Sequence, residues 1–384
     1  MNEALNIYRQ KKVLKITVLQ CRAILFVPLF LILTGICKSQ GLNFNGQLSA
    51  WATGIKSQND WNENSGIRYI PQFNYSYLLG ENDLLNTEVL FNTFYKTDFF
   101  LYDYAFKLYR AILRYTNAQT EIQLGLQKIN FGPALLLRPL MWFDKTDPRD
   151  PLKLTDGVYA LRYKYSFLDN SLLWLWFLYG NANIKGYELL PTSFHKPEFG
   201  GRIQSLIFDG EIAATFHTRK VNGSIFDYRE NRYAVDGRWD IGVGIWFESV
   251  LQQNISDIPI YKWDRMTTFG TDYTIPEGNG IYILAEHMIS TVSTSVWNTD
   301  KNIQISAMML TYSLSLLDNL ILQEYFDWHN KNLYQYFQLQ RTYDNFIINV
   351  ALFHYPENNG ILFLTSNTSL FSGYGLKLIL IYNY

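Results

Sequence analysis

The chain has 384 residues and a formal net charge of −1, from 33 Lys+Arg against 34 Asp+Glu, and its aromatic and charged shares are equal at 17% each. This balance argues against a nucleic-acid-binding protein, which needs a basic face. After residue 39 no stretch of about 18 apolar residues occurs, so helical membrane spans are excluded.

Residues 1–39 have the pattern of a cleaved export signal. A basic stretch comes first, and an apolar run over 23–36 follows, which is shorter than a membrane span. The small residues Cys37 and Ser39 occupy positions −3 and −1 for a signal peptidase. We therefore expect cleavage after Ser39 and a single mature domain over 40–384.

Both cysteines, Cys21 and Cys37, belong to this leader, so the mature chain is expected to contain no disulfide and no thiolate metal ligand. A lipoprotein acylated on Cys37 is the alternative. It is opposed by Ile36, which stands where a lipobox requires a small residue. The leader holds six of the basic residues and one of the acidic ones, which leaves 27 against 33, or −6, on the mature domain.

The mature sequence alternates apolar and polar residues at period two. In 159–167, for example, Tyr159, Leu161 and Tyr163 share one face while Arg162 and Lys164 share the other. We count about 18 such segments, with a range of 14 to 20, and turn residues separate them. This pattern predicts an all-β, antiparallel, up-and-down transmembrane barrel with an apolar outside and a polar inside.

Short and long connections alternate along the chain, as they do in outer-membrane barrels, where short turns and both termini lie in the periplasm. The short ones carry turn residues, as in 79–83 and 168–171. The long connections are expected at about 55–65, 96–104, 132–157, 181–197, 220–231, 252–262, 289–300 and 356–372.

A secreted β-sandwich or solenoid is the alternative to a barrel. Such a fold could not bury the row of bulky apolar side chains over 374–384.

The connection at 132–157 is the strongest candidate for a functional element. It contains four prolines and seven bulky apolar residues over 135–143, which solvent would not favour on a free loop. We therefore predict that it folds inward and narrows the pore. The residues expected at this constriction are Arg138, Trp142, Asp144, Lys145, Asp147, Arg149, Asp150 and Asp156.

Three of these carboxylates, Asp144, Asp147 and Asp150, have a spacing that a calcium loop could also use. The glycine and the terminal glutamate of such a loop are missing, so we predict neither a metal nor a cofactor.

The polar faces of the strands supply the expected lumen residues. A basic wall facing acidic groups would orient a polar or anionic solute, whereas charges that pair between neighbouring strands would only brace the barrel. The sequence leaves both interpretations open, because pairing depends on register. The expected lumen residues are Arg110, Arg114, Glu121, Gln123, Arg162, Lys164, Arg202, His217, Arg219, Arg238, Asp240 and Glu286.

Enzymatic motifs are poor: the five histidines are scattered, and neither a His-Glu-x-x-His nor a Gly-x-Ser-x-Gly pattern occurs. We therefore predict that the chain is not an enzyme. A barrel hydrolase using His217 or His287 beside strand carboxylates is the alternative.

Two segments resemble known families. The end of the chain, with Tyr382, Tyr384 and alternating apolar residues upstream, resembles the signal read by the barrel-insertion machinery. The segment 126–132 with the Asp147-Pro148-Arg149-Asp150-Pro151 run resembles a strand-then-loop pattern of porin-like and capsule-assembly-type barrels of Gram-negative bacteria.

The resemblance implies a porin-like barrel in the Gram-negative outer membrane, in contact with its lipids and lipopolysaccharide. The working function is passive diffusion of small polar or anionic solutes. A non-conducting scaffold for surface lipoproteins or other outer-membrane subunits is the alternative, and a barrel hydrolase is the third.

Overall fold

A computed structural model describes residues 41–57, 60–98, 101–223, 227–255, 261–356 and 372–384. The predicted leader lies outside these ranges, as does most of the predicted connection at 356–372. Where the chain is described, no helix is long and apolar enough to cross a membrane.

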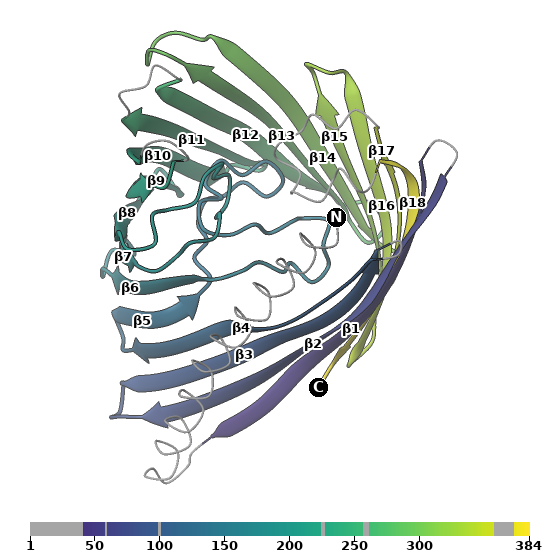
Figure 1. Ribbon diagram of the computed structural model, residues 1–384, viewed down its shortest axis with the longest axis horizontal. Coiled ribbons are helices and arrows are strands. Elements are labelled where there is room, and N and C mark those ends of the chain that lie inside the picture. The colour runs from purple at the N-terminus through teal and green to yellow at the C-terminus, as the bar shows by residue number, and fades with distance from the viewer. Residues whose placement is uncertain (1–40, 58–59, 99–100, 224–226, 256–260, 357–371) are drawn as a thin grey trace, which may run out of the picture. The chain divides into compact units, whose positions relative to one another are not determined.

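The described residues form eighteen strands, and each pairs antiparallel with the strands before and after it (Figure 1). The last strand pairs with the first, from Gln47 opposite Asn383 to Lys56 opposite Tyr374, which closes the sheet. The predicted all-β, up-and-down barrel is confirmed. The strands are β1 (Leu42–Ser57), β2 (Asp60–Leu78), β3 (Leu84–Asp98), β4 (Leu101–Thr116), β5 (Thr120–Gln127), β6 (Val158–Ser166), β7 (Leu172–Leu178), β8 (Glu198–Ile207), β9 (Gly210–Val221), β10 (Tyr228–Asp240), β11 (Gly244–Ile255), β12 (Trp263–Ile275), β13 (Ile281–Ser293), β14 (Lys301–Ser313), β15 (Asp318–Asp327), β16 (Asn332–Thr342), β17 (Phe346–Tyr355) and β18 (Gly373–Asn383).

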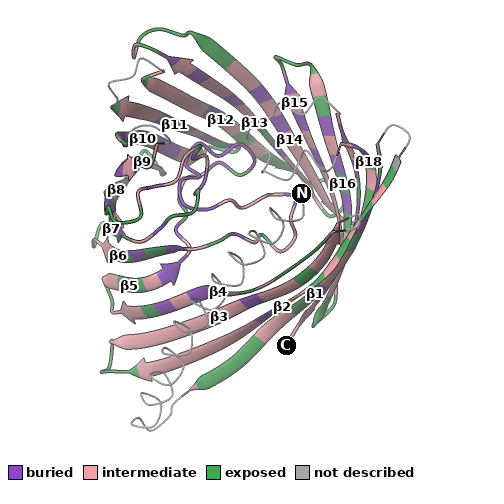
Figure 2. Cartoon of the chain, viewed as in Figure 1, coloured by how far each residue is buried: buried purple, intermediate pink, exposed green. Residues whose placement is uncertain are grey.

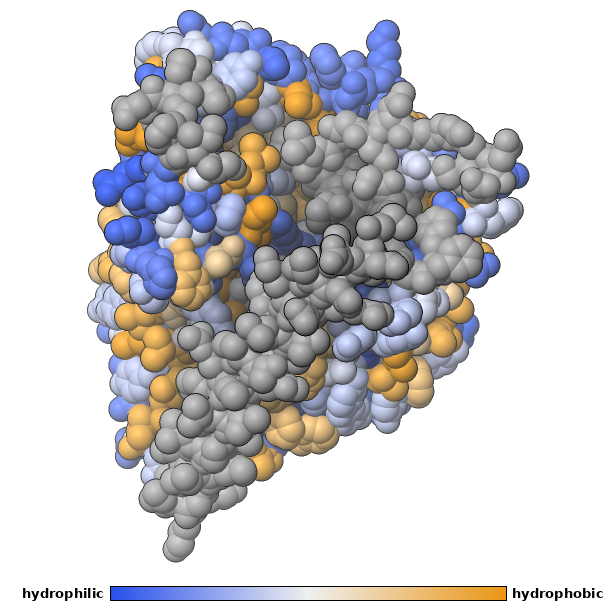
Figure 3. Space-filling view, in the orientation of Figure 1, coloured by the Kyte–Doolittle hydropathy of each residue, from blue (hydrophilic) through white to orange (hydrophobic). Residues whose placement is uncertain are grey.

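The two faces of the strands differ as the period-two pattern requires. Along β10, Arg232 and Ala234 are buried inside the barrel while Tyr233 and Val235 are exposed on its outer surface. Such exposed apolar side chains recur on the outer surface of the strands, and Figure 3 shows apolar residues among polar ones on the face it presents. A barrel with this outer surface is suited to lipid.

Both aromatic residues of the predicted insertion signal lie close to the seam between β1 and β18. The Tyr384 backbone exchanges hydrogen bonds of 3.0 and 3.1 Å with Gly46, and its hydroxyl lies 2.5 Å from that of Tyr69. The Tyr382 ring packs on Phe346 at 4.7 Å. These contacts tie the end of the chain into the closed sheet.

A bulge in β4 changes which side chains enter the lumen. The pairing with β3 shifts between Leu90 and Phe91, so Tyr109 is the extra residue on β4. Before the bulge the exposed apolar residues have even numbers, as in Tyr104, and after it the exposed apolar residue is the odd-numbered Leu113. The bulge therefore turns Arg110 inward.

The connections predicted at 55–65 and 96–104 are wrong, because β1 to β4 continue through them. Polar side chains there remain in the sheet by bonding across strands: Trp51 Nε1 donates to Asn64 Oδ1 at 2.9 Å. The hydroxyls of Ser65 and Thr97 likewise lie 2.9 Å apart. Local polarity is thus a poor sign of a loop where two long strands pair.

At one edge of the barrel the connections have two to five residues, and at the other edge lie the two longest that are described, 128–157 and 179–197. The predicted alternation therefore holds for these two connections and fails on the same edge at β15 and β16, which only four residues join. That the short-turn edge faces the periplasm stays a prediction.

Candidate functional site

The connection between β5 and β6 runs inside the ring of strands, and every residue from 136 to 144 is buried (Figures 1 and 2). Far from its ends, Gln323 on β15 donates a 3.2 Å hydrogen bond to the Pro148 carbonyl, and Arg149 donates a 3.0 Å bond to the Tyr355 hydroxyl on β17. Its end returns to β4, where Lys107 pairs with Asp156 at 2.5 Å. The segment therefore contacts opposite sides of the interior.

Two wall carboxylates hold this segment, here called the inner loop (residues 128–157), by its backbone. Glu248 on β11 accepts from the amides of Ala134 and Leu140 at 2.8 and 3.0 Å. Glu286 on β13 accepts from the three successive amides of 135–137 at 2.7, 2.9 and 2.5 Å. The backbone amides of this loop have no neighbouring strand to pair with. The two carboxylates therefore accept the hydrogen bonds of these buried amides.

Aromatic packing fixes the other part of the inner loop. Phe131 stacks on Trp176 of β7 at 5.5 Å and meets Trp142 edge-on at 5.6 Å. Of the seven apolar residues over 135–143, only Leu135 is exposed. Burying large side chains gives about 1.5–3 kcal/mol each. This burial explains why the apolar patch lies inside.

Charged residues of the inner loop pair within it. Arg138 forms two bonds to Asp144, at 2.9 and 3.2 Å, and Arg149 holds Asp147 at 2.7 Å. Burial works against the charge of Arg138, but the Asp144 carboxylate outweighs it and raises the pKa of Arg138 above its ordinary value. Burial also opposes the charge of Asp147, and Arg149 still lowers the pKa of that carboxyl. The pair of Arg149 and Asp147 is therefore ionised at neutral pH.

The carboxylates considered for calcium serve separate partners. Asp144 accepts from Arg138, and Asp150 accepts from the amides of Leu152 and Leu154 at 3.1 and 3.3 Å. Within the described ranges, no cluster of three or more His, Cys, Asp or Glu residues could hold a metal ion.

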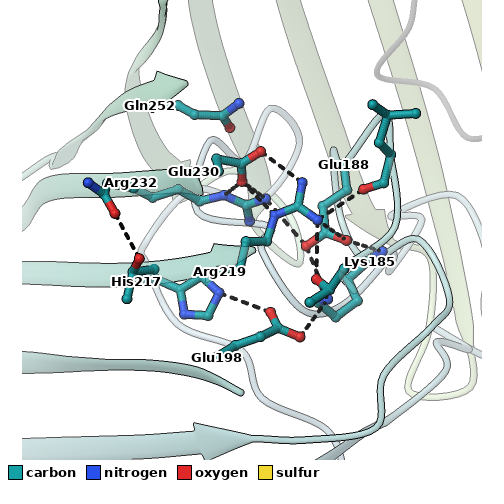
Figure 4. Close-up of polar contacts among 12 residues, drawn as sticks. Lys185, Glu188, Glu198, His217, Arg219, Glu230, Arg232 and Gln252 are labelled. Atoms are coloured by element: carbon teal, nitrogen blue, oxygen red, sulfur yellow. Dashed lines mark hydrogen bonds and ion pairs between the residues drawn. The ribbon is translucent and has the colours of Figure 1, made fainter. Parts of the chain in front are cut away.

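A second connection, residues 179–197, is locked to the wall by buried ions (Figure 4). Glu188 of this connection lies 3.3 Å from both Arg219 of β9 and Arg232 of β10. Glu230 accepts a two-pronged bond from Arg219 at 2.7 and 2.8 Å. Lys185 completes the cluster, 3.3 Å from Glu188. The sequence marks this connection only by its length, and its inward position was not predicted.

His217 lies beneath the same connection and is fully buried. Trp176 Nε1 donates to His217 Nδ1 at 3.2 Å, and His217 Nε2 lies 3.2 Å from Glu198. An indole nitrogen can only donate, so Nδ1 carries no proton and the imidazole is neutral with its proton at Nε2. His217 therefore supports the wall here and does not face solvent.

Several expected lumen residues form ion pairs across the inner wall. Arg162 pairs with Glu121 at 2.5 Å, and Arg202 pairs with Asp236 at 2.5 and 2.8 Å. Other expected lumen residues are placed as follows: Arg238 lies between Asp240 and Asp272 at 3.2 and 3.1 Å, Lys164 lies 5.2 Å from the Trp174 ring centre, and Gln123 is buried beside Gln127. The charges in this part of the inner wall therefore fit the interpretation in which charges pair between neighbouring strands and brace the barrel.

A second sector, formed by β18, β2 and β4, carries cations that pair with no described carboxylate. They are Arg68, Arg110, Arg114 and Lys377, here called the basic wall. Arg110 donates to the backbone carbonyls of Tyr109 and Thr155 at 2.5 and 2.7 Å, and Arg68 lies 5.3 Å from the Trp51 ring centre. Asp150 and Asp156 of the inner loop are acidic neighbours of Arg68. Here Arg68, Arg110 and Lys377 of the basic wall lie near Asp150 or Asp156 of the inner loop. Arg68 and Lys377 are absent from the predicted lumen residues, although both lie on polar strand faces.

No protein-family model and no curated protein matches the sequence. Solved structures do match over most of their length: Acinetobacter baumannii OccAB2 has a TM-score of 0.62 at 9% identity, covering 90% of this chain and 98% of that one. Pseudomonas aeruginosa OccK5 (OpdH) has a TM-score of 0.59 at 10% identity, with coverage of 90% and 98%.

Salmonella typhi OmpF, in complex with daunomycin, has a TM-score of 0.51 at 10% identity, covering 89% of this chain and 97% of that one. These structures are outer-membrane porins. This chain has a porin-like β-barrel fold. The likeness establishes the fold of the porin-like barrel, and the apolar outer surface agrees with the predicted Gram-negative outer membrane.

Proposed function

We propose that the barrel is an outer-membrane channel for passive diffusion of small polar or anionic solutes, narrowed by the inner loop. The observation that carries this proposal is the basic wall opposite Asp150 and Asp156, because cations that face carboxylates across a lumen set up a transverse field. A solute carboxylate or phosphate would be drawn toward Arg68, Arg114 and Lys377. The arginines have the planar geometry that binds such groups.

The first test is anion selectivity in a planar bilayer. Purified barrel should give discrete conductance steps, and a KCl gradient should give a reversal potential on the anion-selective side. Replacing Arg68, Arg114 and Lys377 together by Gln should lower the chloride-to-potassium permeability ratio several-fold, because the counter-charge in the lumen is lost.

Arg341 provides the matched control, since it lies on the outer face and is half-exposed beside Asp318. Arg341→Gln changes the total charge by one without touching the lumen and should leave the ratio unchanged. A triple variant with the wild-type ratio would contradict the proposal.

The second candidate is a non-conducting scaffold for surface lipoproteins or other subunits. The ion cluster that fixes residues 179–197 favours it, because a rigid plug needs such bracing. A correctly folded barrel that stays electrically silent would support this alternative. We also propose that the chain is not an enzyme. We further propose that the barrel-insertion machinery recognises Tyr382 and Tyr384 and inserts the barrel among outer-membrane lipids and lipopolysaccharide.

A further inference from the structure

The shortest part of the wall is formed by β5, β6 and β7, which have eight, nine and seven residues (Figure 1). At about 3.3 Å per residue and a tilt of about 45°, the strand β7 rises roughly 16 Å, which is less than the apolar band of about 25 Å around a barrel. The connection that follows β7 turns into the barrel, so the wall gains no height at that edge. The remaining height has to come from the short turns or from thinning of the bilayer.

The outer surface over β8 carries apolar side chains up to these short turns. Ile203 and Ile207 are exposed on the outside, whereas Arg202 is buried inside the barrel. The exposed apolar surface continues past the ends of the strands. Leu168 in the turn between β6 and β7 is 93% exposed, and Phe208 in the turn between β8 and β9 is 87% exposed. Water does not favour bulky apolar side chains at the tips of turns.

The backbone at Phe208 is in a conformation that bulky residues rarely adopt. Phe208 and Asp209 alone connect β8 to β9, and both have positive φ, 49° and 59°. Two-residue turns of this kind favour Asn or Gly, and a bulky side chain at positive φ is strained. The chain therefore places a phenylalanine where both the backbone and the surrounding water disfavour it. Contact with lipid would offset both penalties.

Hydrogen bonds hold these neighbouring turns in place. The hydroxyl oxygens of Ser171 and Ser205 lie 3.1 Å apart and link the two turns. Trp239, on the outer face of β10, donates from Nε1 to the Ile207 carbonyl at 3.1 Å. Tryptophan concentrates at the boundary between lipid chains and water. Because Phe208 follows Ile207 directly, its side chain lies close to this boundary.

We propose that the turns 167–171 and 208–209 insert into the lipid layer on the short-turn side and complete the apolar band beside the shortest strands. Leu168 and Phe208 contact acyl chains, while the exposed Asp169 and Asp209 stay at the level of headgroups and water. The occupant is lipid because the apolar tips continue the lipid-facing surface of β8. This inference concerns the outer surface and is independent of conduction.

A fluorescent dye at each turn tip tests this proposal. Residues 40–384 contain no cysteine, so one introduced cysteine can carry an environment-sensitive nitrobenzoxadiazole dye. Phe208→Cys and Leu168→Cys barrels, labelled and refolded into phosphatidylcholine vesicles, should both show blue-shifted emission. Phosphatidylcholine with a spin label on its acyl chain should quench these dyes several-fold more strongly than a dye in water. The heat-dependent shift in gel mobility shows which variants are folded.

Glu277→Cys is the matched control, because Glu277 is exposed in the polar turn 276–280 at the same edge. The strands on either side, β12 and β13, have thirteen residues each, enough to span the apolar band without the turn. The dye at this position should be quenched by aqueous iodide and not by the spin-labelled lipid. Dyes at Phe208→Cys and Leu168→Cys that behave like this control would overturn the proposal. Blue-shifted dyes that the spin-labelled lipid does not quench would also overturn it, and would assign the turns to a contact between copies of the barrel.

Discussion

Replacing Glu286 by Gln is expected to free the inner loop and raise single-channel conductance. Each carboxylate oxygen of Glu286 accepts from two donors: Oε1 from Leu135 and from Trp246 Nε1, and Oε2 from Leu136 and Leu137. An amide group has one accepting oxygen, so either orientation of Gln points its NH2 at two donors. Each unsatisfied buried donor costs about 1–3 kcal/mol.

The measurement combines conductance with limited proteolysis of the inner loop. Glu286→Gln should show larger, noisier steps and faster cleavage over 128–157 than wild type. Glu211→Gln is the matched control, because in the described part of the chain Glu211 accepts from one side chain, Gln204 Nε2, at 2.6 Å. Wild-type conductance and proteolysis in Glu286→Gln would show that the carboxylate does not hold the loop.

Replacing Arg219 by Met is expected to cause the largest loss of stability. Its guanidinium is 1% exposed and lies against Glu188 and Glu230, so its removal leaves two buried carboxylates with only part of their partners. Removing one member of a buried ion pair costs about 3–5 kcal/mol. We also expect the connection 179–197 to become accessible to protease.

Arg238→Met is the comparison, because Arg238 is 30% exposed and pairs with the exposed Asp240 and the less exposed Asp272. Partly exposed pairs contribute about 0–1 kcal/mol. In urea unfolding of refolded barrels, the free energies of unfolding of the two variants should therefore differ by several kcal/mol. Similar losses in both would mean that the buried cluster does not lock the connection in place.

The alternation of apolar and polar residues was enough to predict the barrel. Tyr233 and Val235 lie outside and Arg232 lies inside because period two leaves no other arrangement for a sheet between lipid and water. The seven apolar residues over 135–143 likewise pointed to an inward loop. Both inferences rest on hydrophobic burial, and the sequence shows directly which residues are apolar.

Other features depend on register and could not be predicted. Arg110 enters the lumen only because the bulge at Tyr109 shifts the alternation of β4. Arg202 meets Asp236, two strands away, through side chains whose neighbours are set by the ladder. Since a one-residue slip would change every such pair, no single-sequence pattern separates a bracing arginine from a pore-lining one.

The anchoring of the loops was also hidden from the sequence. Glu286 was expected only as a lumen-lining residue, yet it accepts bonds from backbone amides, and these have no sequence signature. Lys185 and Glu188 read as ordinary loop residues. Only their burial against Arg219 reveals that a second connection enters the barrel.

The most direct test of a channel narrowed by its own loop is the single-channel conductance of a variant lacking residues 135–143. This deletion removes the segment held by Glu286 while leaving all eighteen described strands intact. If the barrel remains folded, as judged by its heat-dependent shift in gel mobility, conductance should rise well above the wild-type value and anion selectivity should weaken. A folded deletion variant with unchanged conductance and selectivity would contradict the account.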